Sequence, residues 1–299
     1  MTEQLVVFSS IAAAIFLEAM PFLVIGAVLS AVMEVTLRHD RLARFIPRRF
    51  AGGVALGLGA SLLIPTCECG VVPIVRRLIG KGVPPYVAIV YLLAAPILNP
   101  VVLTSTYIAF RGDLSLVLGR VVIAILVAVA VGGFVRRSPG PAVRSSMTRP
   151  GHDHAAGCDG DGHDSRHSSP VQILLHAAHD FLDMSRFLIL GAVAAALFKT
   201  FLPDAVFDFL CSSPVLAVAG MMALAILLSV CSEADAFVAA SFVAFPPAAR
   251  LAFVAIGPMV DLKLIGMYGT TFSRRLFLAL LIVPTLIVFV ACLIFGWIT

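Results

Sequence analysis

Charged residues are scarce in this sequence. Asp, Glu, Lys and Arg make up 13% of its 299 residues, whereas apolar residues make up 60%. A soluble domain typically carries about 25% charged residues and about 45–50% apolar ones. So few polar side chains cannot cover a surface that faces water, and the composition therefore predicts an integral membrane protein. The apolar runs are long and continuous, which predicts α-helices and not the alternating strands of an outer-membrane barrel.

Several signals are missing altogether. There is no Gly-x-x-x-x-Gly-Lys-Ser/Thr run and no soluble domain large enough to bind a nucleotide, so any transport would be secondary or powered by a partner. Basic and aromatic residues do not interleave, and no nucleic-acid partner is expected. The start of the chain lacks a basic region, so we expect residues 5–35 to form a membrane helix and not a cleaved signal. Most of the six cysteines lie in apolar segments, which argues against a secreted disulfide framework.

The chain divides into two membrane parts, 1–135 and 171–299, joined by a segment at 136–170. That segment is rich in Gly, Ser, Pro, His and charge, and we expect it to be a disordered linker. Its histidines could bind soft or borderline metal ions loosely, although a solvated tether is an equally good interpretation. These histidines are His152, His154, His163 and His167. Eight apolar segments are expected, at 5–35, 52–75, 84–110, 114–135, 187–202, 214–243, 247–272 and 276–298.

The two membrane parts resemble each other. The run FLVIGAV at 22–28 matches FLILGAV at 187–193. Further along the chain, a constant offset of 162 residues pairs several uncommon residues of the two parts. The pairs are Cys69 with Cys231, Pro84-Pro85 with Pro246-Pro247, Pro96 with Pro258, Asn99 with Asp261, and Phe110 with Phe272. Transporters are often built by internal duplication, with the site at the interface of the repeats.

The distribution of Lys and Arg tests the orientation of the repeats. If all eight segments cross the bilayer, the two sides carry equal numbers of basic residues, which is unusual for an inner-membrane protein. If segments 52–75 and 214–243 are instead broken or re-entrant, sixteen basic residues fall on the cytoplasmic side and four outside, counting Arg111 and Arg120 in a loop at 111–120. We therefore predict inverted repeats in a multi-pass protein of the bacterial inner membrane. A parallel repeat of four plus four full helices stays open.

The densest motif is Pro65-Thr66-Cys67-Glu68-Cys69-Gly70, followed by Pro73. Proline and glycine interrupt a membrane helix, and broken backbone at that depth is tolerated only where protein buries it or where it lines a wet cavity. The counterpart in the second part is Cys231-Ser232-Glu233-Ala234-Asp235. Membrane cysteines are often merely small buried side chains. Carboxylates at membrane depth cost at least about 2.5 kcal/mol and usually mark a pathway or a proton relay.

A second pair of motifs interrupts two later segments. Residues 94–100 read AAPILNP and include Asn99, and residues 257–263 read GPMVDLK and include Asp261 and Lys263. Proline and asparagine in these positions should unwind the helix and free backbone carbonyls. Asp261 and Lys263 could carry a coupling ion, or they could pair with each other in a purely structural role.

The stretch IPTCECGVVPIVRRLIGKGVPPYVAIVYLLAAPILNPVVL at 64–103, together with VCSEADAFVAASF at 230–242, resembles the ArsP-type predicted permeases of bacteria. The resemblance implies an integral membrane protein with about eight membrane segments. Some members export trivalent organoarsenicals. Trivalent arsenic is thiophilic, so paired cysteines would suit such a substrate.

We therefore expect an all-α secondary permease that exports a small thiophilic or metal-related solute, and not an enzyme. Cys67, Cys69, Cys231, Glu68 and Asn99 are the expected substrate contacts. Protons or cations would be carried by Glu233, Asp235, Asp261 and Lys263. The alternatives are a non-transporting scaffold or partner subunit in envelope redox or metal handling, and a membrane redox enzyme. The expected partners are the lipid bilayer and a metalloid or other small solute, no cofactor is expected, and a homo-oligomer stays open.

Overall fold

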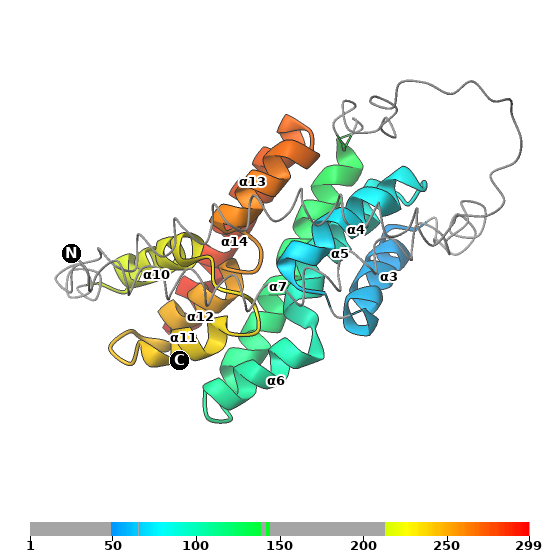
Figure 1. The fold of residues 1–299 in the computed structure, drawn as a ribbon. Coiled ribbons are helices and arrows are strands. Elements are labelled where there is room, and N and C mark those ends of the chain that lie inside the picture. The colour runs from blue at the N-terminus through cyan, green and yellow to red at the C-terminus, as the bar shows by residue number, and fades with distance from the viewer. Residues whose placement is uncertain (1–48, 65, 139–141, 144–212, 299) are drawn as a thin grey trace, which may run out of the picture.

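The computed structural model describes residues 49–64, 66–138, 142–143 and 213–298. Within these ranges every regular element is a helix, and the one β-bridge joins Val143 to Phe272. The prediction of an all-α fold is therefore confirmed for the described part of the chain (Figure 1). The apolar segments at 5–35 and 187–202 lie outside the described residues.

The described helices fall into two sets of five. The first set is α3 (Phe50–Leu63), α4 (Glu68–Gly80), α5 (Pro85–Leu98), α6 (Pro100–Ala109) and α7 (Leu114–Arg137). The second set is α10 (Pro214–Leu228), α11 (Asp235–Ser241), α12 (Pro247–Ile256), α13 (Leu262–Thr271) and α14 (Arg274–Ile298). The order of helices is the same in both sets, and α13 covers the residues that lie 162 positions after those of α6.

Helices α3 and α5 begin at the same end of the molecule. The rings of Phe50 and Tyr86, each near the start of its helix, lie 5.7 Å apart. The guanidinium of Arg136, near the end of α7, lies over both rings, 5.3 Å and 5.7 Å from their centroids. Because α4 connects the end of α3 to the start of α5, α3 and α4 form a hairpin that returns to this end. We call it the Arg137 end, after the last residue of α7; it is at the top of Figure 1.

The long helices α7 and α14 are antiparallel neighbours. Near the Arg137 end, the Ser273 N–H, just before α14, donates to the Ala142 carbonyl at 2.9 Å. Near the opposite end, Gly119 of α7 lies beside Phe295 of α14. This second end carries the α6–α7 turn at Arg111 and is called the Arg111 end. It also holds the start of α12, since the guanidinium of Arg250 lies 5.9 Å from the centroid of the Phe110 ring.

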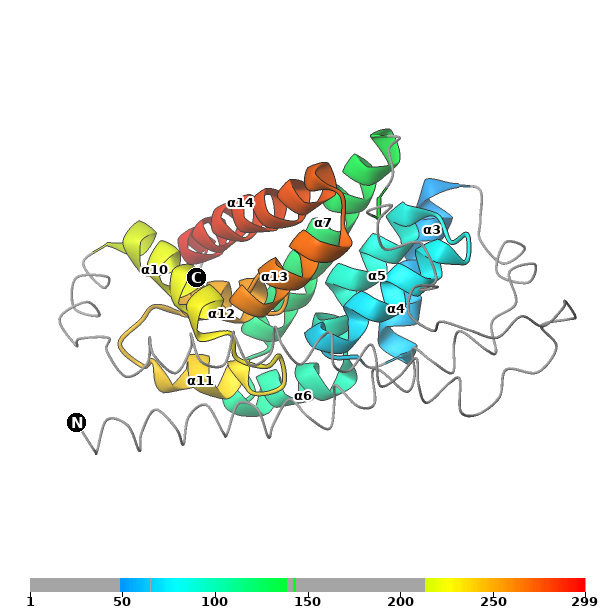
Figure 2. The same ribbon diagram turned by 45° about the horizontal axis from the view of Figure 1, so that its top comes forward.

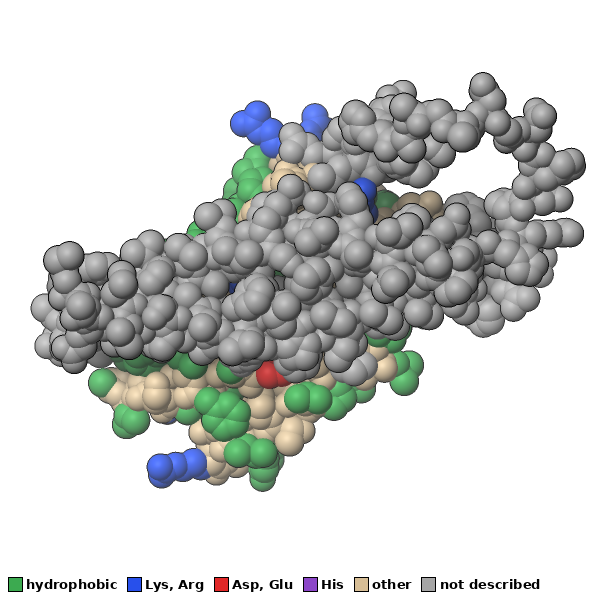
Figure 3. All heavy atoms as spheres, viewed as in Figure 1, with side chains coloured by type: hydrophobic (Ala, Val, Ile, Leu, Met, Phe, Trp, Pro, Cys, Tyr) green, Lys and Arg blue, Asp and Glu red, His purple; other side chains and the backbone are tan. Residues whose placement is uncertain are grey.

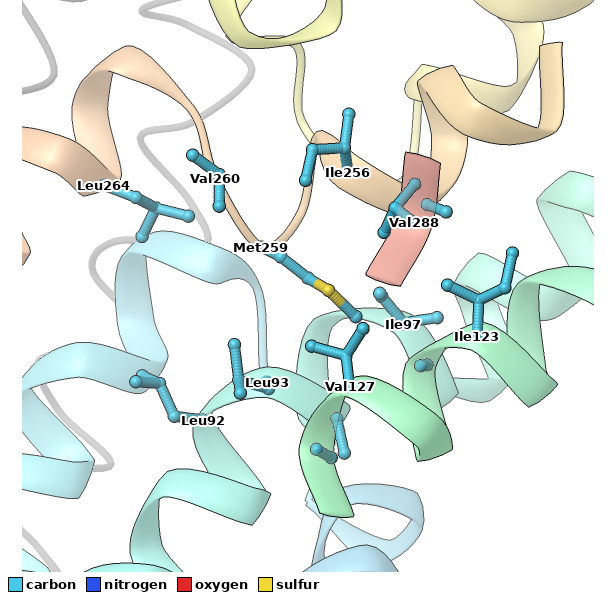
Figure 4. Packing of buried hydrophobic residues seen from close by; sticks show 14 of the residues in the cluster. Leu92, Leu93, Ile97, Ile123, Val127, Ile256, Met259, Val260, Leu264 and Val288 are labelled. Carbon is cyan, nitrogen blue, oxygen red and sulfur yellow. The ribbon is translucent and has the colours of Figure 1, made fainter. Parts of the chain in front are cut away.

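Glycines let the helices of the first set approach closely. A Cβ at Gly57 would lie 2.9 Å from Val90 Cγ1, and a Cβ at Gly132 would lie 2.7 Å from Val90 Cγ2. In lipid, helix association depends on such close van der Waals packing, because the surrounding acyl chains are as apolar as leucine. The two sets meet at Met259, whose side chain extends toward Ile97 and Val127 of the first set (Figure 4).

Within the described residues, three helical stretches are long and apolar enough to cross a membrane, namely Pro85–Ala109, Leu114–Arg137 and Arg274–Ile298. Exposed apolar side chains recur every four residues along α7, at Leu118, Val122 and Leu126. This spacing places them on one helix face, as expected of a surface in contact with lipid. Where described side chains are visible in Figure 3, hydrophobic ones predominate and basic ones stand at the two ends of the molecule.

Two boundaries differ from the sequence-based expectation. Helix α7 begins at Leu114, so Arg120 lies inside a helix, where it is fully buried, and the assignment of Arg120 to a loop was wrong. Helix α7 also continues to Arg137, two residues into the segment expected to be a linker. Apart from residues 136–138, 142 and 143, that linker lies outside the described residues, and so do all four of its histidines.

Candidate functional site

Two helical connections meet in the interior of the molecule. One runs from the end of α3 to the start of α4, and the other from the end of α10 to the start of α11. Helix α10 ends at Leu228, and the backbone of its C-cap residue, Ser229, is left-handed with φ 47° and ψ 42°. The Ser229 hydroxyl oxygen accepts the Leu262 N–H at 3.1 Å, which ties this connection to the start of α13. We call the two connections, residues 64–68 and 229–235, the tips.

Glu68 joins the two tips. Its Oε2 accepts hydrogen bonds from the Ser232 hydroxyl at 3.0 Å and from the Ser232 N–H at 3.4 Å. Its Oε1 lies 3.4 Å from the Lys263 ammonium on α13. Glu68 is only 1% exposed and Lys263 only 2%. The buried carboxylate of Glu68 thus contacts both the opposite tip and α13.

Lys263 is shared by two carboxylates. Besides Glu68, its Nζ lies 3.3 Å from Asp261 Oδ2. The other oxygen of Asp261 accepts the Leu264 N–H at 2.6 Å and so caps α13. Asn99 has the same position before α6, where its Oδ1 accepts the Val101 N–H at 3.0 Å. Asn99 and Asp261 are therefore both N-cap residues, each at the point where an interrupted apolar stretch continues as a new helix.

Cys231 and Glu233 form a thiol–carboxylate pair on the second tip. The Cys231 thiol donates to Glu233 Oε2 at 2.7 Å, and Ser232 Oγ lies 3.4 Å from the same oxygen. Glu233 is partly exposed, unlike Glu68. The Ser232 hydroxyl therefore lies between a partly exposed carboxylate and a fully buried one.

Of the two cysteines in the Cys-Glu-Cys motif, the structure describes the side chain of Cys67 only. Cys67 is buried and directly precedes α4. Cys69 lies in α4, but its side chain is outside the described residues. Within the described ranges, no group of three or more His, Cys, Asp and Glu residues is arranged to hold a metal ion.

A second ion pair lies apart from Lys263. Both terminal nitrogens of Arg120 donate to Asp235, at 3.0 Å to Oδ1 and 2.6 Å to Oδ2. Arg120 Nη1 also donates to the Thr106 hydroxyl at 2.7 Å. All three side chains are buried, and the pair connects α11 of the second set to α6 and α7 of the first. Bidentate, charge-assisted contacts of this kind are among the strongest hydrogen bonds in proteins.

Among the described residues, the site holds more acidic than basic side chains. Glu68, Glu233, Asp235 and Asp261 lie at the tips and breaks, against Arg120 and Lys263. In the part of the chain that the structure describes, Arg120 pairs with Asp235, whereas Lys263 lies between two carboxylates, those of Glu68 and Asp261. An unpaired charge at membrane depth is costly, so this excess of carboxylates can bind protons or a cationic group.

Ser232, Thr106 and Arg120 are not among the site residues predicted from the sequence. Ser232 and Thr106 carry no signal, because a hydroxyl residue in a membrane segment is common. Arg120 did carry one, since it is the single charged residue in the run LSLVLGRVVIAILVAVAV, and a charge inside such a run usually faces the interior of the protein.

Comparison with known proteins agrees with the membrane fold. The profile of the ArsP-type family described as "Predicted permease" matches residues 4–297. A protein of Streptococcus mutans serotype c is 36% identical over 283 residues, covering 94% of this chain and 92% of that protein. Its name proposes that it is a subunit of a two-component membrane permease complex. UPF0718 protein YcgR of Bacillus subtilis is 34% identical over 288 residues, covering 95% of this chain and 94% of that protein. No solved structure matches the chain.

Proposed function

Because this chain belongs to the ArsP-type family of predicted permeases and is a membrane permease, we propose that it is a secondary permease whose solute site lies where the two tips meet. The observation that carries the proposal is the contact of Glu68 with Ser232 and Lys263, which brings both tips and the start of α13 together in the interior. Transporter sites commonly lie near the midplane, between repeats and at interrupted helices.

The two sets of helices are, in this proposal, inverted repeats in the bacterial inner membrane. Three relationships support this view. Helices α7 and α14 occupy equivalent places in the two sets but run antiparallel. Helix α6 packs against α11, and the equivalent helices α13 and α4 pack against each other. The α3–α4 hairpin returns to the Arg137 end, as a re-entrant second segment would.

The proposed roles of the charged residues follow from their surroundings. Glu68 and Glu233 take up protons or the cationic part of the solute, because both lie beside the Ser232 hydroxyl and Glu68 shares Lys263 with Asp261. Asp261 and Lys263 set the charge of this site from α13. Asp235 was expected to carry protons, but its bidentate contact with Arg120 favours a different role, argued below.

The substrate proposed from the sequence is a thiophilic metalloid or metal species that leaves the cell. Cys231 supports it, because its thiol lies beside Glu233, a carboxylate able to accept the thiol proton when sulfur binds a soft ion. Cys67 would contribute a second sulfur from the first tip.

The relative from Streptococcus mutans favours a second candidate role. Its name proposes a two-component complex. The chain would then be one membrane component of a permease that needs a second protein to transport.

Uptake into everted vesicles tests the permease and its substrate. Vesicles that contain the chain should accumulate methylarsenite or one member of a panel of metals and metalloids, and Cys231→Ser should abolish the uptake. Cys292→Ser is the matched control, because Cys292 is also buried but lies in α14. If no member of the panel is taken up, either by the chain alone or by the chain together with a co-encoded membrane protein, the metalloid substrate is wrong. If uptake appears when a co-encoded membrane protein is added, the two-component role is favoured.

A further inference from the structure

The Arg120–Asp235 pair lies between the proposed site and one end of the molecule. Arg120 is six residues into α7, which places it about 9 Å from the Arg111 end at 1.5 Å per residue. Asp235 begins α11 and is two residues beyond Glu233, the partly exposed carboxylate of the site. Helices α11 and α6 lie side by side at the Arg111 end, as Figure 2 shows.

The pair is not part of the internal repeat. The position equivalent to Arg120 in the second set is Ile282, whose side chain is 52% exposed, and the position equivalent to Asp235 in the first set is Pro73. Scaffold features such as the Asn99 and Asp261 caps occur in both sets. The pair therefore serves one end of the molecule only.

Stability alone is a weak reason for a fully buried ion pair. Removing two charges from water costs several kcal/mol, and well-packed apolar residues often stabilise a protein as well or better. The Nε of Arg120 is also buried and has no hydrogen-bond partner among the described residues, so its desolvation is not fully compensated. An arrangement that is strong when formed and costly when half-broken is suited to a contact with two discrete states.

Helix α11 is the element that such a contact would hold. It has only seven residues, Asp235–Ser241, and it lies between turns at 232–234 and 243–244. Its N-terminal residue is held by Arg120, whose own position is set by the Thr106 hydroxyl on α6. Displacement of α11 from α6 and α7 would break the pair and expose the neighbouring tip.

We propose that Arg120 and Asp235 form a gate that closes the site toward the Arg111 end. The proposal rests on the proposed function, since a gate requires a site behind it. When the pair is formed, α11 is docked on α6 and held by Arg120 of α7, and the buried thiol of Cys231 is shut off from the Arg111 end. When the pair separates, the tip of the second set opens to that end. Glu68 and Lys263 remain in the interior in both states.

Alkylation of Cys231 by a membrane-impermeant maleimide, read by peptide mass spectrometry in the otherwise unchanged chain, measures this closure. Right-side-out and everted vesicles offer the two ends separately, and an Arg111→Cys variant identifies which preparation exposes the Arg111 end. From that end, Arg120→Gln and Asp235→Asn should each raise the alkylation rate of Cys231 at least about tenfold, because removal of one partner of a buried pair is strongly destabilising. The double variant should be no more reactive than the single ones, since both remove one interaction. Arg111→Gln is the control and should change nothing.

Unchanged alkylation from the Arg111 end in both single variants overturns the gate, and so does an equal rise from both ends, which would indicate general loosening. If neither single variant reaches the membrane, Thr106→Val carries the test. It keeps both charges, removes the contact that orients Arg120, and should raise alkylation about twofold to fivefold from the Arg111 end alone. The measurement needs no substrate, so a failed uptake assay removes the proposed solute and leaves the gate to stand or fall by alkylation.

Discussion

Asn99 and Asp261 perform the same task in the two halves of this protein. Each lies between two helices in the middle of a long apolar stretch, and each side-chain oxygen accepts a backbone N–H at the start of the helix that follows. The N-terminal N–H groups of a helix have no partner within the helix. In lipid they cannot turn to water, so at these two restarts a short polar side chain supplies the acceptor.

Substitution of Asn99 separates this capping role from substrate binding. Asn99→Ala should lower the free energy of unfolding by about 1 kcal/mol, the usual cost of losing an N-cap. Asn99→Ser keeps a neutral side-chain oxygen that can accept the Val101 N–H and should largely preserve stability. The thermal unfolding midpoint of the detergent-solubilised protein measures both. If Asn99→Ser transports normally, Asn99 acts through its cap; a loss of transport at unchanged stability would restore it as a substrate contact.

Neutralisation of Glu68 should abolish transport. Glu68→Gln leaves Lys263 beside Asp261 and removes the charge that joins the tips. We expect at least about a hundredfold loss of uptake, since one partner removed from a buried, hydrogen-bonded ion pair costs about 3–5 kcal/mol. Initial uptake rates in everted vesicles measure the effect.

Ser232→Ala is the graded companion to that variant. It removes the hydroxyl that donates to Glu68 at 3.0 Å but retains every charge. Uptake should fall by about fivefold to tenfold, in line with the 1.5–3 kcal/mol or so of a hydrogen bond to a charged group, reduced by the backbone N–H that remains. Normal uptake in Glu68→Gln would contradict the proposed site.

Two glycines of α3 should respond in opposite ways to alanine. A Cβ at Gly57 would lie 2.9 Å from Val90 Cγ1 and 3.0 Å from the Val87 carbonyl oxygen, whereas a Cβ at Gly59 would meet nothing within 4 Å. Gly57→Ala should therefore separate α3 from α5 and lower stability by about 1–3 kcal/mol, as overpacking does. Gly59→Ala should be neutral or stabilise by up to about 1 kcal/mol through its better helix propensity. Thermal midpoints that shift equally in both variants would rule out close packing of α3 on α5.

Cysteines at the two ends test the proposed topology. Lys81→Cys lies in the turn after α4, and Arg111→Cys lies in the turn after α6. An impermeant thiol reagent added to intact cells should label Arg111→Cys and not Lys81→Cys, because the bulk of the basic residues then faces the cytoplasm. Labelling of Lys81→Cys from outside, with Arg111→Cys protected, would invert the proposed orientation.

Much of this arrangement could be predicted because a membrane helix is recognised from the residues of its own short stretch of sequence. Long apolar runs, prolines and the repeated spacing indicated an all-α fold and located the interruptions near Cys67 and Cys231, and the described helices end and restart at these places. The ion pairs could not be predicted in the same way. Glu68 and Lys263 are 195 residues apart, Arg120 and Asp235 are 115 apart, and nothing local in either segment specifies its partner.

The sequence by itself determined that the chain is a membrane protein, that its described segments are helical, and where those helices are interrupted. It could do so because hydropathy, helix propensity and proline act over a few residues. Only the tertiary structure decided which buried charged side chains form ion pairs with each other. It placed Asp235 on Arg120 and Lys263 between Glu68 and Asp261. The physical reason is that a buried charge takes whatever partner the packing of distant helices brings within about 4 Å, and that packing depends on the shapes of helix faces across the whole molecule.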